Sequence, residues 1–269
     1  QPPDAHIDAD YPQLLAQRVP LGVEETIPTS PDIWPTKEEL QQYDAEEEPP
    51  MPEAHPNYPS ADKHADAIEA TYREDVAEGM ASGPHTIDEA AHLCNCTPNQ
   101  LIFGALAGKP EGRYHGYFRT IHNGTVVHVN NWIRLNMPGR TTAPTLHDAA
   151  TALYRANMSG LHTLLKTDIT KAQGRIRISQ KDWKYIPAFI NNNAYINTCE
   201  TYGVASAQYY WGRLATLLIR ILYYLFPDIP WIMVYVDDFL IMLPDGDQGN
   251  LATSILLMLT ALGCPLSWK

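Results

Sequence analysis

Apolar residues spaced by about four positions predict helices in the stretch that begins at Ser60. The apolar stripe consists of Ile68, Tyr72, Val76 and Met80, and one helix face would carry it. Thr86 with Glu89 forms a capping signal for a second helix, and Thr97, which a proline follows, begins a third. We therefore expect residues 60–108 to be a helical segment that packs ahead of the main domain.

Beyond residue 108 the pattern changes to short apolar or alternating runs, which predict strands. These runs lie at 126–129, 161–167, 175–178, 188–190 and 194–197, and 231–243 is expected to form a hairpin. Helices are expected from Thr145 to Gly160, from Ala207 to Phe226 and from Asn250 to Leu262. The order of these elements predicts an α+β fold with a mostly antiparallel sheet and helices on one face.

The first 59 residues differ from the rest of the chain in composition. Of the 22 prolines, 12 lie in the first 60 residues, and residues 44–48 form an acidic run. Such a segment buries too little apolar surface to offset the entropy lost on ordering, so we expect residues 1–59 to be largely extended or disordered. One short helix is expected within them, where Thr36 and Glu39 form a capping box.

Charge is divided unevenly along the chain. The net charge is −12, but residues 1–100 carry 21 acids and 4 bases, whereas residues 101–269 carry 10 acids and 15 bases. The basic second part is compatible with a polyanionic partner, which the acidic net charge alone would argue against. No uncharged apolar run is long enough to predict a membrane span. The four scattered cysteines indicate reduced thiols, as in an intracellular protein of the cytoplasm or nucleus.

Two adjacent aspartates, Asp237 and Asp238, lie between two apolar strands of the predicted hairpin. An exposed hairpin would favour Asn-Gly or Asp-Gly at its turn and polar residues on one face. Ionised side chains at the end of a buried ribbon are costly unless they are paired or bind a metal. Asp168 also follows an apolar run directly, and it would join the other two if its strand pairs beside the hairpin.

Three carboxylates at one place would indicate a divalent metal site. Like charges that close do not all remain ionised without a cation. The candidate ligands are oxygen atoms alone, which favours Mg²⁺, with Mn²⁺ as an alternative, over zinc. Two such ions are the usual apparatus for displacement at phosphorus. The sequence therefore predicts metal-assisted phosphoryl chemistry at Asp168, Asp237 and Asp238.

Five motifs follow one another in the second part of the chain, at residues 118–125, 166–173, 201–208, 235–238 and 262–269. In this order they resemble the motifs of a reverse transcriptase, the RNA-directed DNA polymerase of a retroelement or retrotransposon. Their separations are similar to those of the family, with 35 residues from Asp168 to Gly203 and 34 from Gly203 to Asp237. The resemblance covers residues 109–269 and implies a polymerase palm with partial fingers. It is closest to the long-terminal-repeat and tyrosine-recombinase types.

The resemblance implies a role for each motif. Asp168, Asp237 and Asp238 would be catalytic and, with the backbone carbonyl of Ile169, would hold two Mg²⁺ ions. The enzyme would be a nucleotidyltransferase that joins a dNTP to a primer 3′-hydroxyl on an RNA or DNA template. The nucleotide-binding residues would be Arg119, Ala172, Gln173, Gly203 and Gln208. Lys269 is the candidate general acid, and nucleic-acid contacts would come from Lys171, Arg175, Arg177 and Tyr235. A basic, strand-spaced patch is formed by Lys171, Arg175, Arg177, Lys181 and Lys184, and for this patch a solvated surface is the equal alternative to contact with phosphates.

Some positions depart from the family pattern. Gln173 stands where an aromatic residue usually rejects a 2′-hydroxyl, and Asn123 stands where an acid is usual. No basic residue lies two positions before Arg119, and the sequence does not show whether Arg113 or Lys109 takes its place.

The chain ends at Lys269, where the thumb of the polymerase should follow, and it begins without Met. We therefore expect a fragment of a polyprotein. The alternative function is that of an inactive retroelement remnant that binds nucleic acid or protein. The sequence specifies neither the template nor the oligomeric state.

Overall fold

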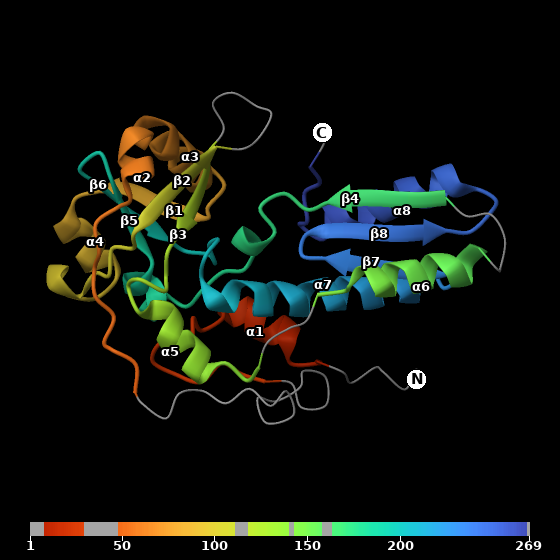
Figure 1. Ribbon diagram of the computed structural model, residues 1–269, viewed down its shortest axis with the longest axis horizontal. Coiled ribbons are helices and arrows are strands. Elements are labelled where there is room, and N and C mark those ends of the chain that lie inside the picture. The colour runs from red at the N-terminus through yellow and green to blue at the C-terminus, as the bar shows by residue number, and fades with distance from the viewer. Residues whose placement is uncertain (1–7, 30–47, 111–117, 140–142, 158–162, 268–269) are drawn as a thin grey trace. The chain divides into compact units, whose positions relative to one another are not determined.

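The computed structural model describes residues 8–29, 48–110, 118–139, 143–157 and 163–267, and these form two compact units (Figure 1). Unit 1 comprises Gln1–Arg140 and Gln173–Tyr209, and unit 2 comprises Thr141–Ala172 and Tyr210–Lys269. Both combine helices with antiparallel strands, so the expected mixture of helix and antiparallel sheet is confirmed. No helix within the described ranges is long and apolar enough to cross a membrane.

Unit 1 contains a three-stranded sheet and a separate two-stranded ribbon. The sheet has the order β1-β6-β5, with β1 at Ala81–His85, β5 at Pro187–Ile190 and β6 at Asn193–Asn197. The ribbon pairs β2, Leu106–Pro110, with β3, Phe118–His122. The α-helices are α1 Tyr11–Gln17, α2 Pro59–Lys63, α3 Ala65–Ala77, α4 Ile87–Leu93 and α5 Val129–Asn136. The 3₁₀ helices are η1 Pro98–Gln100, η2 Gln173–Arg175 and η3 Gln180–Tyr185.

The expected helix starts and the expected hairpin in unit 1 are present. Thr86 and Thr97 form the predicted capping boxes of α4 and η1. The β5–β6 hairpin is held against α3 by Glu69, whose carboxylate accepts hydrogen bonds from Asn191 at 2.9 Å and from Tyr195 at 2.9 Å. These bonds, the one from Asn191 foremost, lower the pKa of Glu69 to about 2. Hydrogen bonding thus compensates for burial of the carboxylate.

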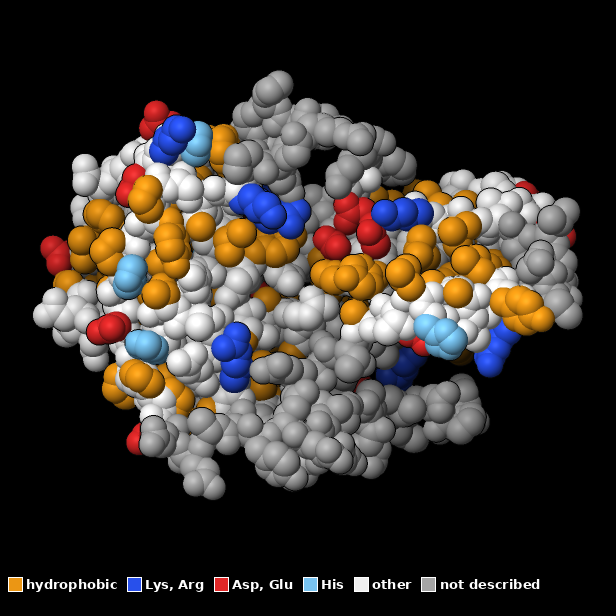
Figure 2. All heavy atoms as spheres, viewed as in Figure 1, with side chains coloured by type: hydrophobic (Ala, Val, Ile, Leu, Met, Phe, Trp, Pro, Cys, Tyr) orange, Lys and Arg blue, Asp and Glu red, His pale blue; other side chains and the backbone are white. Residues whose placement is uncertain are grey.

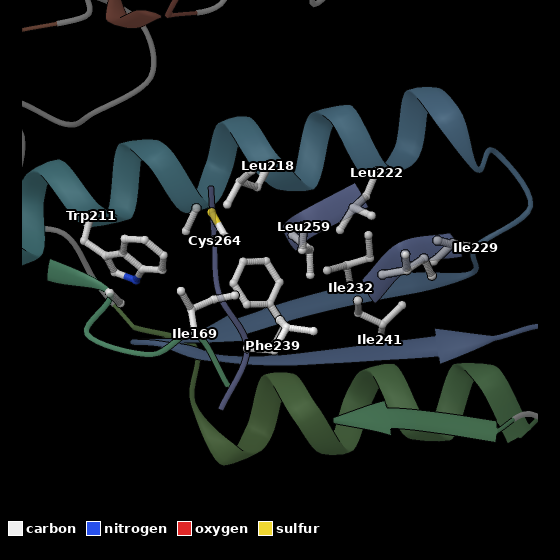
Figure 3. Close-up of a cluster of buried hydrophobic side chains, with 14 of the residues drawn as sticks. Ile169, Trp211, Leu218, Leu222, Ile229, Ile232, Phe239, Ile241, Leu259 and Cys264 are labelled. Atoms are coloured by element: carbon white, nitrogen blue, oxygen red, sulfur yellow. The ribbon is translucent and has the colours of Figure 1, made fainter. Parts of the chain in front are cut away.

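Unit 2 is a three-stranded antiparallel sheet packed on helices. The strand order is β4-β8-β7, with β4 at Thr163–Asp168, β7 at Trp231–Tyr235 and β8 at Asp238–Leu243. The helices are α6 Leu146–Asn157, α8 Gln248–Ala261 and the greater part of α7, Ala205–Leu225. Figure 3 shows Trp211, Leu218 and Leu222 of α7 directed toward the strands that carry Phe239 and Ile241. The predicted strand before Asp168, the 231–243 hairpin and the two long apolar helices are therefore confirmed.

Two predicted strands are wrong, and three strands were missed: β1 and β2, which lie wholly or mostly in the 60–108 segment that was expected to be helical, and β3. Residues 124–127 form a turn because Asn123 Oδ1 accepts from the amides of Thr125 and Val126, both at 3.2 Å, and Val129 then begins a helix. Residues 175–178 contribute only isolated bridges at positions 177 and 178. The missed strand β1 contains Gly and Pro, which are unusual in strands. Turn chemistry and tertiary pairing overrode the local pattern in each case.

The described part of the N-terminal segment differs from the disorder expected for residues 1–59. Tyr11, Val19, Leu21 and Ile27 are completely buried. Val19 donates its amide to the carbonyl of Arg177 at 2.9 Å and accepts from the amide of Ser179 at 2.8 Å. Apolar residues alternate from Val19 to Val23, a pattern that the prediction from composition did not take into account. The helix expected at Thr36 lies outside the described residues.

Candidate active site

Asp168 and Asp238 lie directly opposite each other in the sheet of unit 2. Asp168 is the last residue of β4, Asp238 is the first of β8, and their Cα atoms are paired in the antiparallel register. Opposed residues of an antiparallel pair point to the same face, and neighbours along a strand point to opposite faces. Both carboxylates are therefore on the face opposite Phe239, which is buried in the core. The structure brings these two residues together as the strand order requires.

Asp237 lies in the turn between β7 and β8, beside the same pair. Its carbonyl accepts a hydrogen bond from the amide of Ile169 at 3.2 Å, which links the turn to the end of β4. Val236 has a φ of 59°, an uncommon conformation for a β-branched residue. Trp211 Nε1 of α7 donates to the Val236 carbonyl at 2.5 Å. The acidic turn is thus strained and anchored to a core helix, which is typical of functional turns.

A third segment pairs beside Asp168. The amide of Ser267 donates to the carbonyl of Asp168 at 2.9 Å, and Leu266 forms a bridge with Ile169. The glycine-containing motif therefore reaches the carboxylate end of the sheet. Lys269, the candidate general acid, lies outside the described residues.

The electrostatics of this face include a basic residue that the sequence analysis did not single out. Lys166 Nζ lies 3.1 Å from Asp238 Oδ2, and Tyr235, opposite Asp238 in the register, is also on this face. Figure 2 shows a group of acidic side chains exposed on the surface. The signal for Lys166 was present in the sequence, because a residue two positions before Asp168 in a strand shares its face.

The donor set at this face consists of carboxylate oxygens together with backbone carbonyls. That chemistry fits Mg²⁺ or Mn²⁺ and does not fit the nitrogen and sulfur preference of zinc. Among the described residues, no three His, Cys, Asp or Glu side chains are arranged to enclose a metal ion. The opposed pair of Asp168 and Asp238 is therefore the part of the predicted metal site that the backbone register defines.

Of the predicted nucleotide-binding residues, Arg119 and Gly203 lie in unit 1. Arg119 of β3 is opposite Lys109 of β2, and its guanidinium lies 5.1 Å from the ring centroid of Tyr202. Lys109 is thus the alternative that the structure places beside Arg119, while Arg113 lies outside the described residues. Gly203 has a φ of +97°, and a Cβ there would lie 1.9 Å from the His122 carbonyl oxygen. Glycine is therefore required at position 203 by the backbone itself, independently of any contact with a nucleotide.

Gln173 and Gln208 of unit 1 contact each other. Gln173 Nε2 donates to Gln208 Oε1 at 3.4 Å, a long hydrogen bond, and Gln173 Oε1 is buried without a hydrogen-bond partner. Ala172, the next residue toward β4, has its methyl group buried in the core of unit 2. Only the backbone of Ala172 is therefore suited to contact a ligand.

The predicted basic patch is largely paired with acidic residues of unit 1. Arg175 is 3.3 Å from Glu78, Lys181 is 2.6 Å from Glu25, and Lys184 is 2.7 Å from Glu24. The hydrogen bond from Lys184, followed by that from Tyr185, lowers the pKa of Glu24. Because Arg175 and Arg177 do not lie in one strand, the expected strand-spaced arrangement is wrong. Lys171 adopts a positive φ of 51° in the turn after β4.

Two buried carboxyl groups of unit 1 were missed by the sequence analysis. Burial raises the pKa of Glu200 to about 8, and Ser206 Oγ donates to Glu200 Oε1 at 2.8 Å while Oε2 has no partner. Burial also raises the pKa of Asp182 to about 6, against the effect of the Leu21 amide, which donates to Oδ2 at 3.0 Å. Neither residue stands in a motif, so no sequence signal identified them.

No family model matches the chain, and no curated protein matches its sequence. Its structure is similar to that of the prototype foamy virus protease–reverse transcriptase in the native form, with a TM-score of 0.52, 15% identity, and coverage of 82% of this chain and 25% of the viral chain. The foamy viral protease–reverse transcriptase in complex with double-stranded DNA gives a TM-score of 0.55, 13% identity, and coverage of 83% and 35%. A CSH mutant of the prototype protein gives a TM-score of 0.53 at 13% identity, with coverage of 81% and 25%.

The chain has a reverse-transcriptase-like fold. It spans only 25–35% of the length of these viral proteins. At such low identity the likeness shows the fold alone, and it does not support a particular type of retroelement.

Proposed function

We propose that the chain is the polymerase portion of an RNA-directed DNA polymerase that adds a nucleotide from a dNTP to a primer 3′-hydroxyl. The observation that carries this proposal is the register of β4 and β8, which sets Asp168 opposite Asp238 at the acidic turn. Carboxylates opposed in this way on a reverse-transcriptase-like fold support polymerase chemistry more than a structural turn, because two like charges on one face gain from a bound cation.

The proposed metal ligands are Asp168, Asp237 and the carbonyl of Ile169, with Asp238 adding negative charge nearby. When bound, Mg²⁺ would lower the pKa of the primer hydroxyl and neutralise charge on the phosphates. The chain's own contribution is to hold the carboxylates on one rigid sheet edge. The link from the Ile169 amide to the Asp237 carbonyl and the link from Trp211 to Val236 fix that edge.

Unit 1 would supply the groups that bind the incoming nucleotide. Arg119 and Lys109 carry positive charges on opposed positions of the β2–β3 ribbon, which suits a triphosphate. Gln173, Gln208 and Gly203 would contact the sugar and base through side chain or backbone. In this assignment the ribbon belongs to the fingers and the β4-β8-β7 sheet to the palm.

The proposed partner is a primer–template duplex, RNA or DNA in the template strand. One similar structure is a foamy viral protease–reverse transcriptase in complex with double-stranded DNA, which supports a duplex as the ligand. The retroelement origin, its long-terminal-repeat or tyrosine-recombinase type and the intracellular location remain parts of this proposal.

Single-nucleotide primer extension tests the proposed activity. The purified chain is incubated with a labelled primer on an RNA template, one complementary dNTP and Mg²⁺, and the +1 product is resolved on a gel. We expect template-directed addition that Asp168→Asn abolishes and that Glu74→Asn, a change at an exposed acid, preserves. If the chain binds the duplex but adds no nucleotide to the primer, the proposed polymerase activity is refuted. That result would favour the alternative of an inactive module that binds nucleic acid.

A further inference from the structure

Two basic side chains face each other on the β2–β3 ribbon. Lys109 and Arg119 are Cα partners in the register, so both point to the same face. Gly108 points to the other face, since a Cβ there would meet the Ser60 carbonyl at 3.1 Å and Ile68 at 3.1 Å. Like charges directly opposite each other destabilise an antiparallel pair. Two cations on one face of the ribbon are suited to binding a polyanion such as a chain of phosphates.

Tyr202 lies over one of these cations. The Arg119 guanidinium carbon is 5.1 Å from the centroid of the Tyr202 ring, within the range of a cation–π interaction. Stacking uses the flat face of the guanidinium, whereas a phosphate binds its N–H edge, so both interactions can occur together. The aromatic ring thus restricts the guanidinium without competing for phosphate.

The backbone that carries Tyr202 is fixed to the ribbon. The Tyr202 carbonyl accepts a hydrogen bond from the amide of His122 at 3.0 Å, and Gly203 lies so close to His122 that a Cβ there would be 1.9 Å from the His122 carbonyl oxygen. Asn130 holds the other side of the turn, since its Nδ2 donates to the Gly203 carbonyl at 2.8 Å and its Oδ1 accepts from the Ala205 amide at 2.8 Å. The ring therefore stands at a defined position relative to β3.

A hollow adjoins this arrangement. It has a volume of about 360 Å³, and its lining includes Ala107, Ile121 and Gly203. Ala107 and Ile121 are paired in the register and share the face of Lys109 and Arg119. The hollow therefore lies next to the pair of residues that neighbours the two cations on the same face of the ribbon.

We propose that Tyr202 is a positioning residue that holds the Arg119 guanidinium, so that Arg119 and Lys109 form a preset site for the phosphates of a nucleoside triphosphate. This inference rests on the proposed function, which it deepens by naming how the phosphate-binding arginine is oriented. The hydrogen bonds of Asn130 to the Gly203 carbonyl and the Ala205 amide hold the turn that carries the Tyr202 ring. The contact of Tyr202 with Arg119 was not anticipated from the sequence.

Binding of inorganic tripolyphosphate to the full chain, measured by calorimetry in metal-free buffer, tests the inference. We expect Tyr202→Leu to weaken binding roughly three- to tenfold, the scale of one cation–π contact. Tyr202→Phe retains the ring and should bind within twofold of the unaltered chain. Arg119→Lys keeps the charge but loses the planar face, so it should weaken binding as well. Tyr154→Leu, a change at an exposed tyrosine of unit 2, is the matched control and should have no effect.

A double-mutant cycle separates positioning from general loss of structure. If Tyr202 acts through Arg119, Tyr202→Leu should have no further effect once Arg119 is replaced by alanine. Equal binding by Tyr202→Leu and the unaltered chain would overturn the proposal, as would equal losses in Tyr202→Phe and Tyr202→Leu.

The outcome also distinguishes this proposal from the proposed activity. If the variants show the expected tripolyphosphate affinities while the chain extends no primer, the proposed polymerase activity is refuted. That result would still support the role of Tyr202. Absence of tripolyphosphate binding by the unaltered chain would overturn both the positioning role and the phosphate site.

Discussion

Lys166 and Asp238 form an ion pair of 3.1 Å on the face of the unit 2 sheet that also carries Asp168. Lys166 is two residues before Asp168 in β4, so strand alternation gives both side chains the same face. The chain therefore supplies a cation of its own to the carboxylates. The pair is largely exposed, and its contribution to stability is expected to be small. Its consequence is electrostatic, because it offsets part of the negative charge that attracts a metal.

Removing this lysine charge should strengthen metal binding. In Lys166→Met the carboxylates lose a neighbouring positive charge, and we expect the affinity for Mn²⁺ to rise about threefold to tenfold, on the order of the ~1 kcal/mol of a close pair near the surface. Electron paramagnetic resonance of free Mn²⁺ measures this directly. Lys184→Met is the control, because that lysine is paired with Glu24 in unit 1. Unchanged or weaker Mn²⁺ binding in Lys166→Met would contradict the electrostatic argument.

Divalent cations should raise the melting temperature of the unaltered chain. A metal at ten times its dissociation constant stabilises the folded state by about 1.4 kcal/mol. For a chain of this size that corresponds to an increase of about 3–6 °C. Asp168→Asn should lose most of the increase, which differential scanning fluorimetry with Mg²⁺ and Mn²⁺ can follow. If the unaltered chain shows no increase at millimolar metal, the carboxylates do not share a cation.

Stability should fall between about pH 5 and pH 8 because of Glu200. Its pKa is raised by burial from 4.5 to about 8, with Asp182 adding to the effect by its charge. The folded state then binds more protons than the unfolded state in this range, so the neutral carboxyl favours folding at low pH and the benefit is lost as pH rises through about 8. Glu200→Gln cannot ionise and should show a smaller fall.

The measurement is the difference in melting temperature between Glu200→Gln and the unaltered chain at pH 5 and at pH 8. The difference should favour the variant more at pH 8. Glu74→Gln, at an exposed acid, serves as the control and should show no such trend. A difference independent of pH would mean that Glu200 is not neutral in the folded protein.

Pairing at the N-terminal segment should limit contact with nucleic acid. Glu24 and Glu25 neutralise Lys184 and Lys181 in unit 1. Replacing both acids with glutamine leaves the buried Val19 and Leu21 in place and removes the competing charges. We expect the double variant to bind a primer–template duplex more tightly and its affinity to depend more steeply on salt, by a slope change of roughly two for two released lysines.

Fluorescence anisotropy between low and moderate salt provides the slope. Glu53→Gln with Glu74→Gln removes the same charge elsewhere and is the matched control. Identical slopes in the unaltered chain and the Glu24/Glu25 variant would show that these lysines do not contact phosphates.

The sequence predicted those elements whose structure depends on the pattern of neighbouring residues. The apolar helices, the hairpin around Asp237 and the strand before Asp168 were predicted because burial requires their patterns. The juxtaposition of Asp168 with Asp238 followed from a pairing assumption that the β4–β8 register bears out.

The remaining features depend on contacts between distant residues. The turn at Asn123 depends on a side-chain acceptor, and strand β1 depends on pairing with β6, more than a hundred residues away in sequence. The stacking of Arg119 on Tyr202 and the pairing of Lys184 with Glu24 likewise have no local signature. Composition predicted a largely extended or disordered N-terminal segment, whereas its described part binds η3 through the ion pairs of Glu24 and Glu25 and the hydrogen bond from the Leu21 amide to Asp182.

Gln173 should make a polymerase of this kind tolerant of ribonucleotides. An aromatic ring at this position would exclude a 2′-hydroxyl by its bulk, whereas the glutamine is thinner. Its Nε2 donates to Gln208, and its buried Oε1 has no partner. An incoming hydroxyl could therefore donate to that oxygen. We expect Gln173→Tyr to increase discrimination against ribonucleotides by ~1–3 kcal/mol, about 10–200-fold.

Paired titrations of dNTP and rNTP in single-nucleotide extension give the ratio of kcat/KM values that measures this discrimination. Gln208→Leu is the informative companion, because it removes the acceptor that holds the Gln173 amide without adding an aromatic ring. If the hydroxyl is accepted by the Gln173 amide, Gln208→Leu should change the ratio far less than Gln173→Tyr does. The same ratio in Gln173→Tyr and the unaltered chain would mean that another residue contacts the sugar, because a ring at a site next to the ribose cannot leave that ratio unchanged.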